Sequence, residues 1–218
     1  PGLALPLIAL QYHEVKVVLN HQWQSAGPFT TATFTNKLFC DYIYLDTDER
    51  RRFAQVSHEY LIEQVQEQSL SDPDGSNDLN FNHPVKELIW TRSSAESKSM
   101  LPRAVGTGTY QMKLNGHDRF APRDYRYFTR TQVWQHHTGC GGIAASATKA
   151  SGAAVDSIAV YSFALKPEEH QPSGTCNFSR IDNAQLVNVG SGAADKIFAV
   201  NYNVLRIMSG MGGLAYSN

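Results

Sequence analysis

The stretch LNFNHPVKELIW (residues 79–90) alternates apolar and polar residues, and His83-Pro84 interrupts the alternation near its middle. Alternation with a period of two is typical of a β-strand that buries one face. A proline cannot donate to a strand ladder, and it favours an extended conformation for the residue before it. We therefore predict a long strand with a kink or bulge at His83, with Leu88 and Trp90 directed into a core. His83 could instead serve as a ligand or a catalytic base, but we favour the structural interpretation.

Similar strand patterns recur along the chain. Tyr110, Met112 and Leu114 alternate with polar residues, which predicts a half-buried strand. The run IAVYSFAL (158–165) is short and continuously apolar, which predicts a strand covered on both faces. NYNVLRIM (201–208) reads as a final strand. HEYLIEQVQ (58–66) fits a strand, although its apolar residues also permit a helix.

Glycine- and proline-rich turns separate these runs, for example at SDPDGSND (71–78), which we interpret as a solvated loop. Gly139–Gly152 is rich in small residues and is predicted to be a long surface loop. The helical candidate is DYRYFTRTQVW (124–134). Many short strands separated by such turns predict an all-β fold, an antiparallel jelly-roll β-sandwich.

Composition narrows the function classes. The chain has 218 residues, a hydrophobic fraction of 42%, a charged fraction of 18% and a net charge of −1. A nucleic-acid binder would normally carry a basic surplus, so we expect no direct contact with nucleic acid. No run approaches the roughly 18 apolar residues of a membrane span, and no signal peptide is recognisable. Cys40, Cys140 and Cys176 form no CxxC pair and are expected to be reduced thiols, as in the cytoplasm.

One pattern occurs twice. An irregular stretch leads into the strand-like run YHEVKVVL (12–19), and a similar stretch leads into NAQLVNV (183–189). Each is followed by a further strand-like run, CDYIYLD (40–46) or VNYNVLRIM (200–208). Between the copies lies DTDERRRFAQV (46–56), which is charged and predicted to be a turn-rich linker. The repetition suggests two similar β domains in tandem, with the front of the first domain missing from this chain.

Metal sites are the first candidate chemistry. His136-His137 with Cys140 could supply nitrogen and sulfur ligands, but adjacent side chains diverge, and no third ligand stands at a zinc-like spacing. Asp72, Asp74 and Asp78 resemble a calcium loop, but Gly75 stands at position 4 and Pro73 intrudes.

Other candidate motifs are equally incomplete. Gly210-Met211-Gly212-Gly213 and Gly106-Thr107-Gly108 lack the lysine and helix of a phosphate loop, and Asn177-Phe178-Ser179 is a formal glycosylation sequon. A jelly-roll enzyme would need clustered histidines or paired carboxylates. The residues available for such clusters are scattered singles: His13, His21, His58, His83, His117 and His170, with Glu14, Glu59, Glu63 and Glu87. We therefore predict no catalytic, cofactor-binding or metal site, and no enzyme.

Several long stretches do resemble a known family. They are FNHPVKELIW (81–90), LNGHDRF (114–120), YSFALKPEEHQPSGTCNFSRIDNAQL (161–186) and NYNVLRIMSGMGGLAYSN (201–218), together with PGLALPLIALQYHEVK (1–16) and HEYLIEQ (58–64). They closely resemble the major capsid proteins of large icosahedral nucleocytoplasmic DNA viruses, nearest to the algal-virus (phycodnavirus) and iridovirus side of that group. The resemblance covers most of the chain and departs at residues 20–38, 67–78, 91–109 and 138–157.

The resemblance implies two consecutive jelly rolls in one protein, and three proteins in a trimeric, pseudo-hexagonal capsomer of an icosahedral shell. Residues 1–47 would be the terminal strands of a truncated first jelly roll, 48–57 a linker and 58–218 the second jelly roll, so the chain is expected to be a carboxyl-terminal fragment. The implied location is the virion, after assembly in the host cytoplasm. The implied partners are two further copies, neighbouring capsomers, minor capsid proteins and surface glycans.

One alternative function stays open. The predicted truncation also leads to an expectation about the unpaired strands. A carbohydrate-binding jelly-roll module could stack sugars on surface tryptophan and tyrosine residues. If the first domain is incomplete, residues 12–19 and 40–46 lack most of their sheet partners and should be frayed or mispaired.

Overall fold

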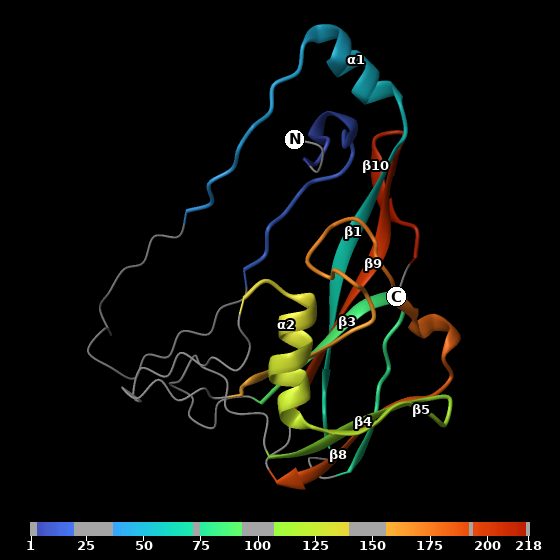
Figure 1. Cartoon of the computed structure of the whole chain (residues 1–218). Helices are drawn as coiled ribbons and strands as arrows, with labels where there is room; N and C mark the ends of the chain where they lie inside the picture. The colour runs from blue at the N-terminus through green and yellow to red at the C-terminus, as the bar shows by residue number, and fades with distance from the viewer. Residues whose placement is uncertain are drawn as a thin grey trace, which may run out of the picture. The chain divides into compact units, whose positions relative to one another are not determined.

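The computed structural model describes residues 4–19, 37–71, 75–92, 107–139, 156–191 and 194–216, and strands dominate them (Figure 1). The chain divides into two compact units. One unit runs from Ile62 to Asn203, and the other combines Pro1–Leu61 with Val204–Ser217.

Two antiparallel sheets form the body of the Ile62–Asn203 unit. The first sheet has the order β1 (His58–Ser69), β9 (Lys196–Met208), β3 (Pro84–Thr91), β6 (Ile158–Ser162). The second has the order β2 (Ser76–Asp78), β8 (Ala184–Ser191), β4 (Thr107–Leu114), β5 (His117–Asp124). A two-residue strand, β7 (Cys176–Asn177), also pairs with β3.

The pairing order identifies the topology. Strands pair in a nested series, β1 with β9, β2 with β8, β3 with β6 and β4 with β5. Such a series is one long antiparallel hairpin, and the further pairs β9–β3 and β8–β4 roll that hairpin into two facing sheets. This is the jelly roll, which confirms the predicted fold class.

The hydrophobic core lies between the two sheets. Leu88 and Trp90 on β3 are fully buried, as predicted, and so are Met112 on β4 and Leu186 on β8. The Trp90 ring centroid lies 5.3 Å from that of Tyr110 on β4. Because β3 and β4 belong to different sheets, this aromatic contact joins the inner faces of the sandwich.

The predicted helix is present. It consists of the π-helical turn η2 (Tyr127–Thr131) followed directly by α2 (Gln132–His136). Phe128 is buried with its ring centroid 5.1 Å from that of Trp90. The helix therefore closes one side of the core.

The prediction of one long strand through His83 is wrong, although the predicted irregularity at His83 is present. His83 has φ +68°, a left-handed rather than an extended conformation, and β3 begins only at Pro84. Its N–H donates to Ser179 Oγ at 2.8 Å, and its carbonyl accepts from the Phe178 N–H at 3.1 Å. These tertiary hydrogen bonds hold a conformation that the pre-proline preference disfavours. The register shift in the strand lies further on, between Val85 and Glu87.

Other predicted strands are present but begin or end at different residues. HEYLIEQVQ is strand, within β1, and the run 158–165 is strand only as far as Ser162. NYNVLRIM forms the end of β9, but it is not the final strand, because β10 (Met211–Leu214) follows and pairs with it. Ser76–Asp78, expected in a loop, form β2, and residues 72–74 lie outside the described residues, as do residues 140–152 of the long loop predicted at 139–152.

The unit of Pro1–Leu61 and Val204–Ser217 contains few regular elements. It has η1 (Leu7–Ala9), α1 (Thr47–Gln55), the start of β1, the end of β9, and β10. The turn-rich linker predicted at 46–56 is a helix, because the Asp46 N–H donates to Glu49 Oε2 at 3.3 Å and so caps the first turn.

Residues 12–19 and 40–46, predicted to be strands, are not in strands in this structure. Neither run pairs with a strand among the described residues, so its backbone has no ladder to join. Val18 is 78% exposed and Tyr44 is 91% exposed.

Candidate functional site

A cluster of buried charges lies on β3, within the Ile62–Asn203 unit. The Lys86 side chain is 3% exposed, and its Nζ lies 2.7 Å from Glu63 Oε1 on β1. Nζ also donates to the Pro167 carbonyl at 2.6 Å and lies 5.5 Å from the centre of the Tyr202 ring. Charges this deeply buried need such partners, so Lys86 ties β1 and the segment after β6 to β3.

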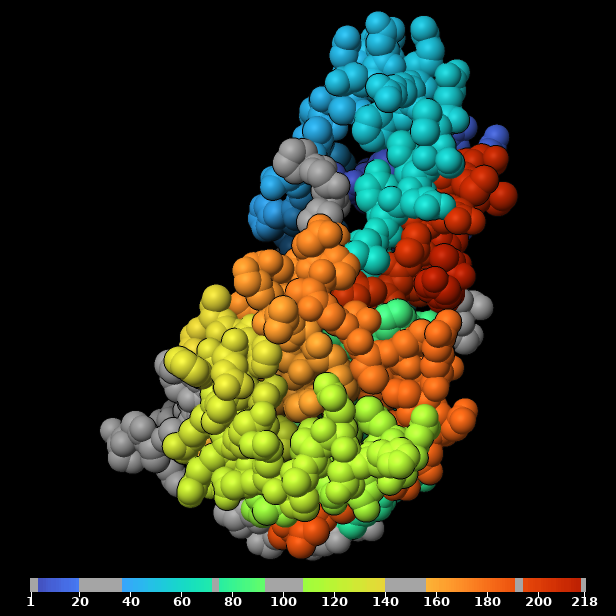
Figure 2. Space-filling view, turned by 45° about the vertical axis from the view of Figure 1, so that its right-hand side comes forward, coloured from blue at the N-terminus to red at the C-terminus, as the bar shows by residue number. Residues whose placement is uncertain are grey.

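The neighbouring residue, Glu87, forms the second half of this cluster. Its Oε2 lies 2.9 Å from His137 Nε2, and the other ring nitrogen, Nδ1, lies 3.2 Å from Glu168 Oε1. The shorter separation is that of an ion pair, although the ring N–H is not aimed as a well-formed hydrogen bond requires. Glu168 also accepts from the N–H and the hydroxyl of Thr138. In Figure 2, residues near 135 (yellow) lie against the segment that follows β6 (orange).

The electrostatics follow from these contacts. Glu87 is the largest cause that raises the pKa of His137 above its ordinary 6.5; burial opposes the increase, and Glu168 adds to it. The hydrogen bonds from Thr138, followed by the contact with His137, lower the pKa of Glu168. Burial raises the pKa of Tyr202, and so do the nearby carboxylates of Glu63 and Glu87. The cluster therefore favours a charged imidazole at His137, between the carboxyl groups of Glu87 and Glu168.

The structure brings three residues that the sequence reasoning treated as singles, Glu63, Glu87 and His170, together with His137 of the adjacent histidine pair. It separates the adjacent histidines, since His136 Nδ1 faces the Leu165 carbonyl at 3.1 Å. Among the described residues, no group of three or more metal-ligating side chains occurs. Cys140 lies outside the described residues. Sequence reasoning missed Lys86 and Glu168.

The remaining candidate residues lie in strands, contact other parts of the chain or fall outside the described residues. Asp78 lies in β2, His117 begins β5, and Glu59 pairs with Arg206. His58 Nε2 donates to the Phe53 carbonyl at 2.8 Å. His21, Asp72, Asp74 and Gly106 lie outside the described residues.

Gly108 allows close packing of two strands, and the sequon residues make local hydrogen bonds. Gly108 lies where a Cβ would collide with the Val189 carbonyl on β8, so only glycine fits there. Asn177 is exposed, and its Oδ1 accepts from the Ser179 N–H at 3.1 Å. The Ser179 hydroxyl in turn holds His83.

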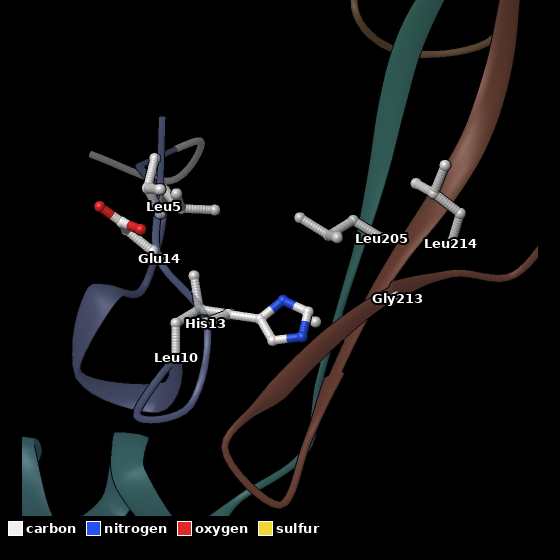
Figure 3. Close-up of a pocket in the computed structure, with 9 residues that line it drawn as sticks. Leu5, Leu10, His13, Glu14, Leu205, Gly213 and Leu214 are labelled. Carbon is white, nitrogen blue, oxygen red and sulfur yellow. The ribbon is translucent and has the colours of Figure 1, made fainter. Parts of the chain in front are cut away.

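The glycines at 210–213 lie beside a small pocket in the Pro1–Leu61 and Val204–Ser217 unit. Figure 3 shows the His13 ring pointing toward the β9–β10 hairpin and the Glu14 carboxylate pointing away. The lining is mainly apolar: Leu5, Leu10, His13, Glu14, Val15, Leu205, Gly212, Gly213 and Leu214. The Tyr12 N–H donates to the Gly210 carbonyl at 2.9 Å. These glycines therefore admit residues 10–13 at close range and do not form a phosphate cradle.

Trp90 is buried in the core, whereas Trp134 on α2 is 75% exposed. Within the described residues, no helix has the length and apolar character needed to cross a membrane. Cys40 and Cys176 are free thiols.

Comparisons with known proteins give the family. The family described as "Large eukaryotic DNA virus major capsid protein" matches residues 49–213. The major capsid protein of Pyramimonas orientalis virus is 52% identical, over 100% of this chain and 58% of that protein. The major capsid protein of Paramecium bursaria Chlorella virus 1 is 40% identical, over 100% of this chain and 64% of that protein.

A solved structure agrees with these matches. The quasi-atomic model of the PBCV-1 virus capsid superimposes with a TM-score of 0.72 at 35% identity, over 100% of this chain and 68% of that one. The chain thus spans 58% and 64% of the length of these two curated relatives. The family match and the jelly-roll strand order point the same way: the chain belongs to the family of large eukaryotic DNA virus major capsid proteins.

Proposed function

We propose that this chain is part of a major capsid protein and forms the shell of an icosahedral DNA virus. Three copies would form a pseudo-hexagonal capsomer, which would contact neighbouring capsomers and minor capsid proteins in the virion. The observation that carries the proposal is the nested strand pairing of a jelly roll in a chain whose residues 49–213 match the capsid family. The role is structural and includes no catalytic step.

We further propose that residues 58–218 are one jelly roll, that 48–57 link it to a preceding one and that 1–47 belong to that preceding jelly roll. The exposed apolar side chains of residues 12–19 and 40–46 support this assignment, because such runs normally face a sheet partner. The partial coverage of the longer relatives also supports it.

The physics of the fold suits a shell. A β-sandwich with a rigid aromatic core presents stable side walls, and a jelly roll limits the number of unprotected strand edges that could pair wrongly at high concentration. Contacts repeated around a closed lattice add through multivalency, so each contact can be weak. Surface loops can vary without disturbing the walls.

Oligomeric mass and particle images test the proposal. The full-length protein that contains this chain should have the mass of a trimer in light scattering, and electron micrographs should show pseudo-hexagonal outlines. A monomer at every concentration, with no ordered assembly, would contradict the proposal.

The carbohydrate-binding alternative has its own assay. Glycan-array binding by the 218-residue chain that is lost in Trp134→Ala, the exposed tryptophan of α2, would favour that function. We expect no difference between this variant and the unmodified chain.

A further inference from the structure

The protonation state of the His137 imidazole decides how many hydrogen bonds its ring nitrogens can donate. A neutral imidazole carries one N–H, so it can donate through only one ring nitrogen, whereas an imidazolium donates through both. In this chain both nitrogens face carboxylates, Nε2 at 2.9 Å from Glu87 and Nδ1 at 3.2 Å from Glu168. Only the charged ring carries a proton on both nitrogens and a positive charge beside both carboxylates.

The two carboxylates come from different parts of the fold. Glu87 lies on β3 with 9% of its side chain exposed, while Glu168 lies on the segment between β6 and β7. His137 itself ends α2, where its N–H donates to the Val133 carbonyl at 2.8 Å. One imidazole therefore connects the end of α2, the central strand β3 and the 163–175 segment.

Other charged and polar groups lie near the contact between His137 and Glu87. From β1 comes Glu63, whose Oε1 lies 2.7 Å from Lys86 Nζ of β3 and 4.0 Å from His170 Nδ1. From β9 comes the buried Tyr202 ring. The other histidine of α2, His136, faces a carbonyl. Since Lys86 is engaged with Glu63, His137 is the cation placed against Glu87.

We propose that His137 is a pH-controlled latch that holds the 163–175 segment and the end of α2 against β3. When the ring loses its proton, one carboxylate contact is lost, and the buried Glu87 loses its countercharge. The part of the segment around Glu168 then loosens from the end of α2 and from β3, while Lys86 still holds the Pro167 carbonyl, so the outer surface that the segment forms changes with pH.

The direction of the response follows from the contacts. The folded chain raises the pKa of His137 above its ordinary 6.5. The stabilisation is therefore complete below the ordinary pKa and is lost as the pH rises through the higher folded value. The latch is closed in mildly acidic solution and opens toward alkaline pH.

Nuclear magnetic resonance of the whole chain labelled at histidine tests the latch directly. The His137 ring should be protonated on both nitrogens at pH 6.5 in the greater part of the molecules, and its titration midpoint should lie above the ordinary 6.5. Hydrogen exchange, corrected for the intrinsic effect of pH, should show protection of residues 163–175 falling as the pH rises from about 6 to about 9.

Matched variants separate the latch from a general loss of stability. His137→Gln should abolish the pH dependence of protection in residues 163–175, while His136→Gln, its neighbour on α2, should leave it intact. Glu168→Gln changes an exposed partner and should lower the His137 titration midpoint without unfolding the chain. A His137 titration at or below the ordinary value, or the same pH dependence in His137→Gln and the unmodified chain, would overturn the proposal.

Discussion

The side-chain amide of Gln66 on β1 pairs with both backbone groups of Asn82. Gln66 Nε2 donates to the Asn82 carbonyl at 2.7 Å, and the Asn82 N–H donates to Gln66 Oε1 at 3.1 Å. Two residues further along β1, Gln68 binds the Asp78 carbonyl and the Asn80 N–H in the same way. These glutamines take the place of a neighbouring strand for the irregular segment between β2 and β3.

Replacement of Gln66 by Leu should therefore destabilise the chain. It removes both partners of the Asn82 backbone and a further hydrogen bond to Asn201 Oδ1 at 3.0 Å. We expect a loss of about 1–3 kcal/mol in the free energy of unfolding, measured by urea denaturation. The control is Glu67→Gln, at the adjacent, outward-facing position, which breaks only an exposed pair with Lys196 and should cost less than about 1 kcal/mol. Equal losses in the two variants would contradict the pairing role.

The sequence predicted this part of the fold only in outline. Alternation in β3 and β4 correctly placed Leu88, Trp90, Tyr110 and Met112 in the core, because period two reports which face is buried. The same signal failed at 12–19, since alternation says nothing about whether a partner strand is present. It failed at His83 because hydrogen bonds from residues about a hundred positions away override a local preference.

Trp90 offers a test of the predicted core. Its ring is fully buried and packs against both Tyr110 on β4 and Phe128 of the helix, so Trp90→Ala removes contacts with both. We expect a loss of about 3–5 kcal/mol in the free energy of unfolding. The same substitution at Trp134, which is 75% exposed, should change the stability by no more than about 0.5 kcal/mol. A large loss at Trp134 would indicate that α2 buries its outer face, for example in an oligomer.

The charged cluster on β3 could not be predicted from the sequence, for a different reason. Glu87 and His137 meet through the packing of α2 against the sheet, and fifty residues separate them in the chain. Spacing rules find ligands on one element, such as adjacent histidines, and cannot find pairs that tertiary packing creates. The only local signal was the charged run at 166–170, which also contains Glu168.

Asp156 should make the stability depend on acid pH. Arg130 binds both of its carboxylate oxygens, at 2.9 and 2.8 Å, and the Thr129 hydroxyl donates to it at 2.7 Å. Burial alone would raise the pKa of Asp156, but these hydrogen bonds outweigh burial and lower the pKa below its ordinary 3.8. The stabilisation is thus present above the ordinary value and is lost as the pH falls through the lower folded value.

Asp156→Asn should therefore lower the urea midpoint at neutral pH, and the difference from the unmodified chain should shrink below about pH 3.8. The control is Asp118→Asn on β5, an exposed position, which should leave the midpoint unchanged. A difference that stays constant down to the lowest pH would show that packing, not the ion pair, accounts for the effect.

Gly210 tests the close approach of residues 10–13 to the β9–β10 turn. Its φ is +81°, and an added Cβ would lie 2.6 Å from the Tyr12 ring, so Gly210→Ala meets both backbone strain and a collision. We expect a loss of about 1 kcal/mol or more in the free energy of unfolding, with increased hydrogen exchange at the Tyr12 amide. Gly213→Ala is the matched control, because nothing lies within 4 Å of its added Cβ. The double variant Tyr12→Ala with Gly210→Ala removes the collision but keeps the strain, so it should lose less than the sum of the two single changes. Strict additivity would assign the whole cost to the left-handed backbone and none to the packing of the amino-terminal segment.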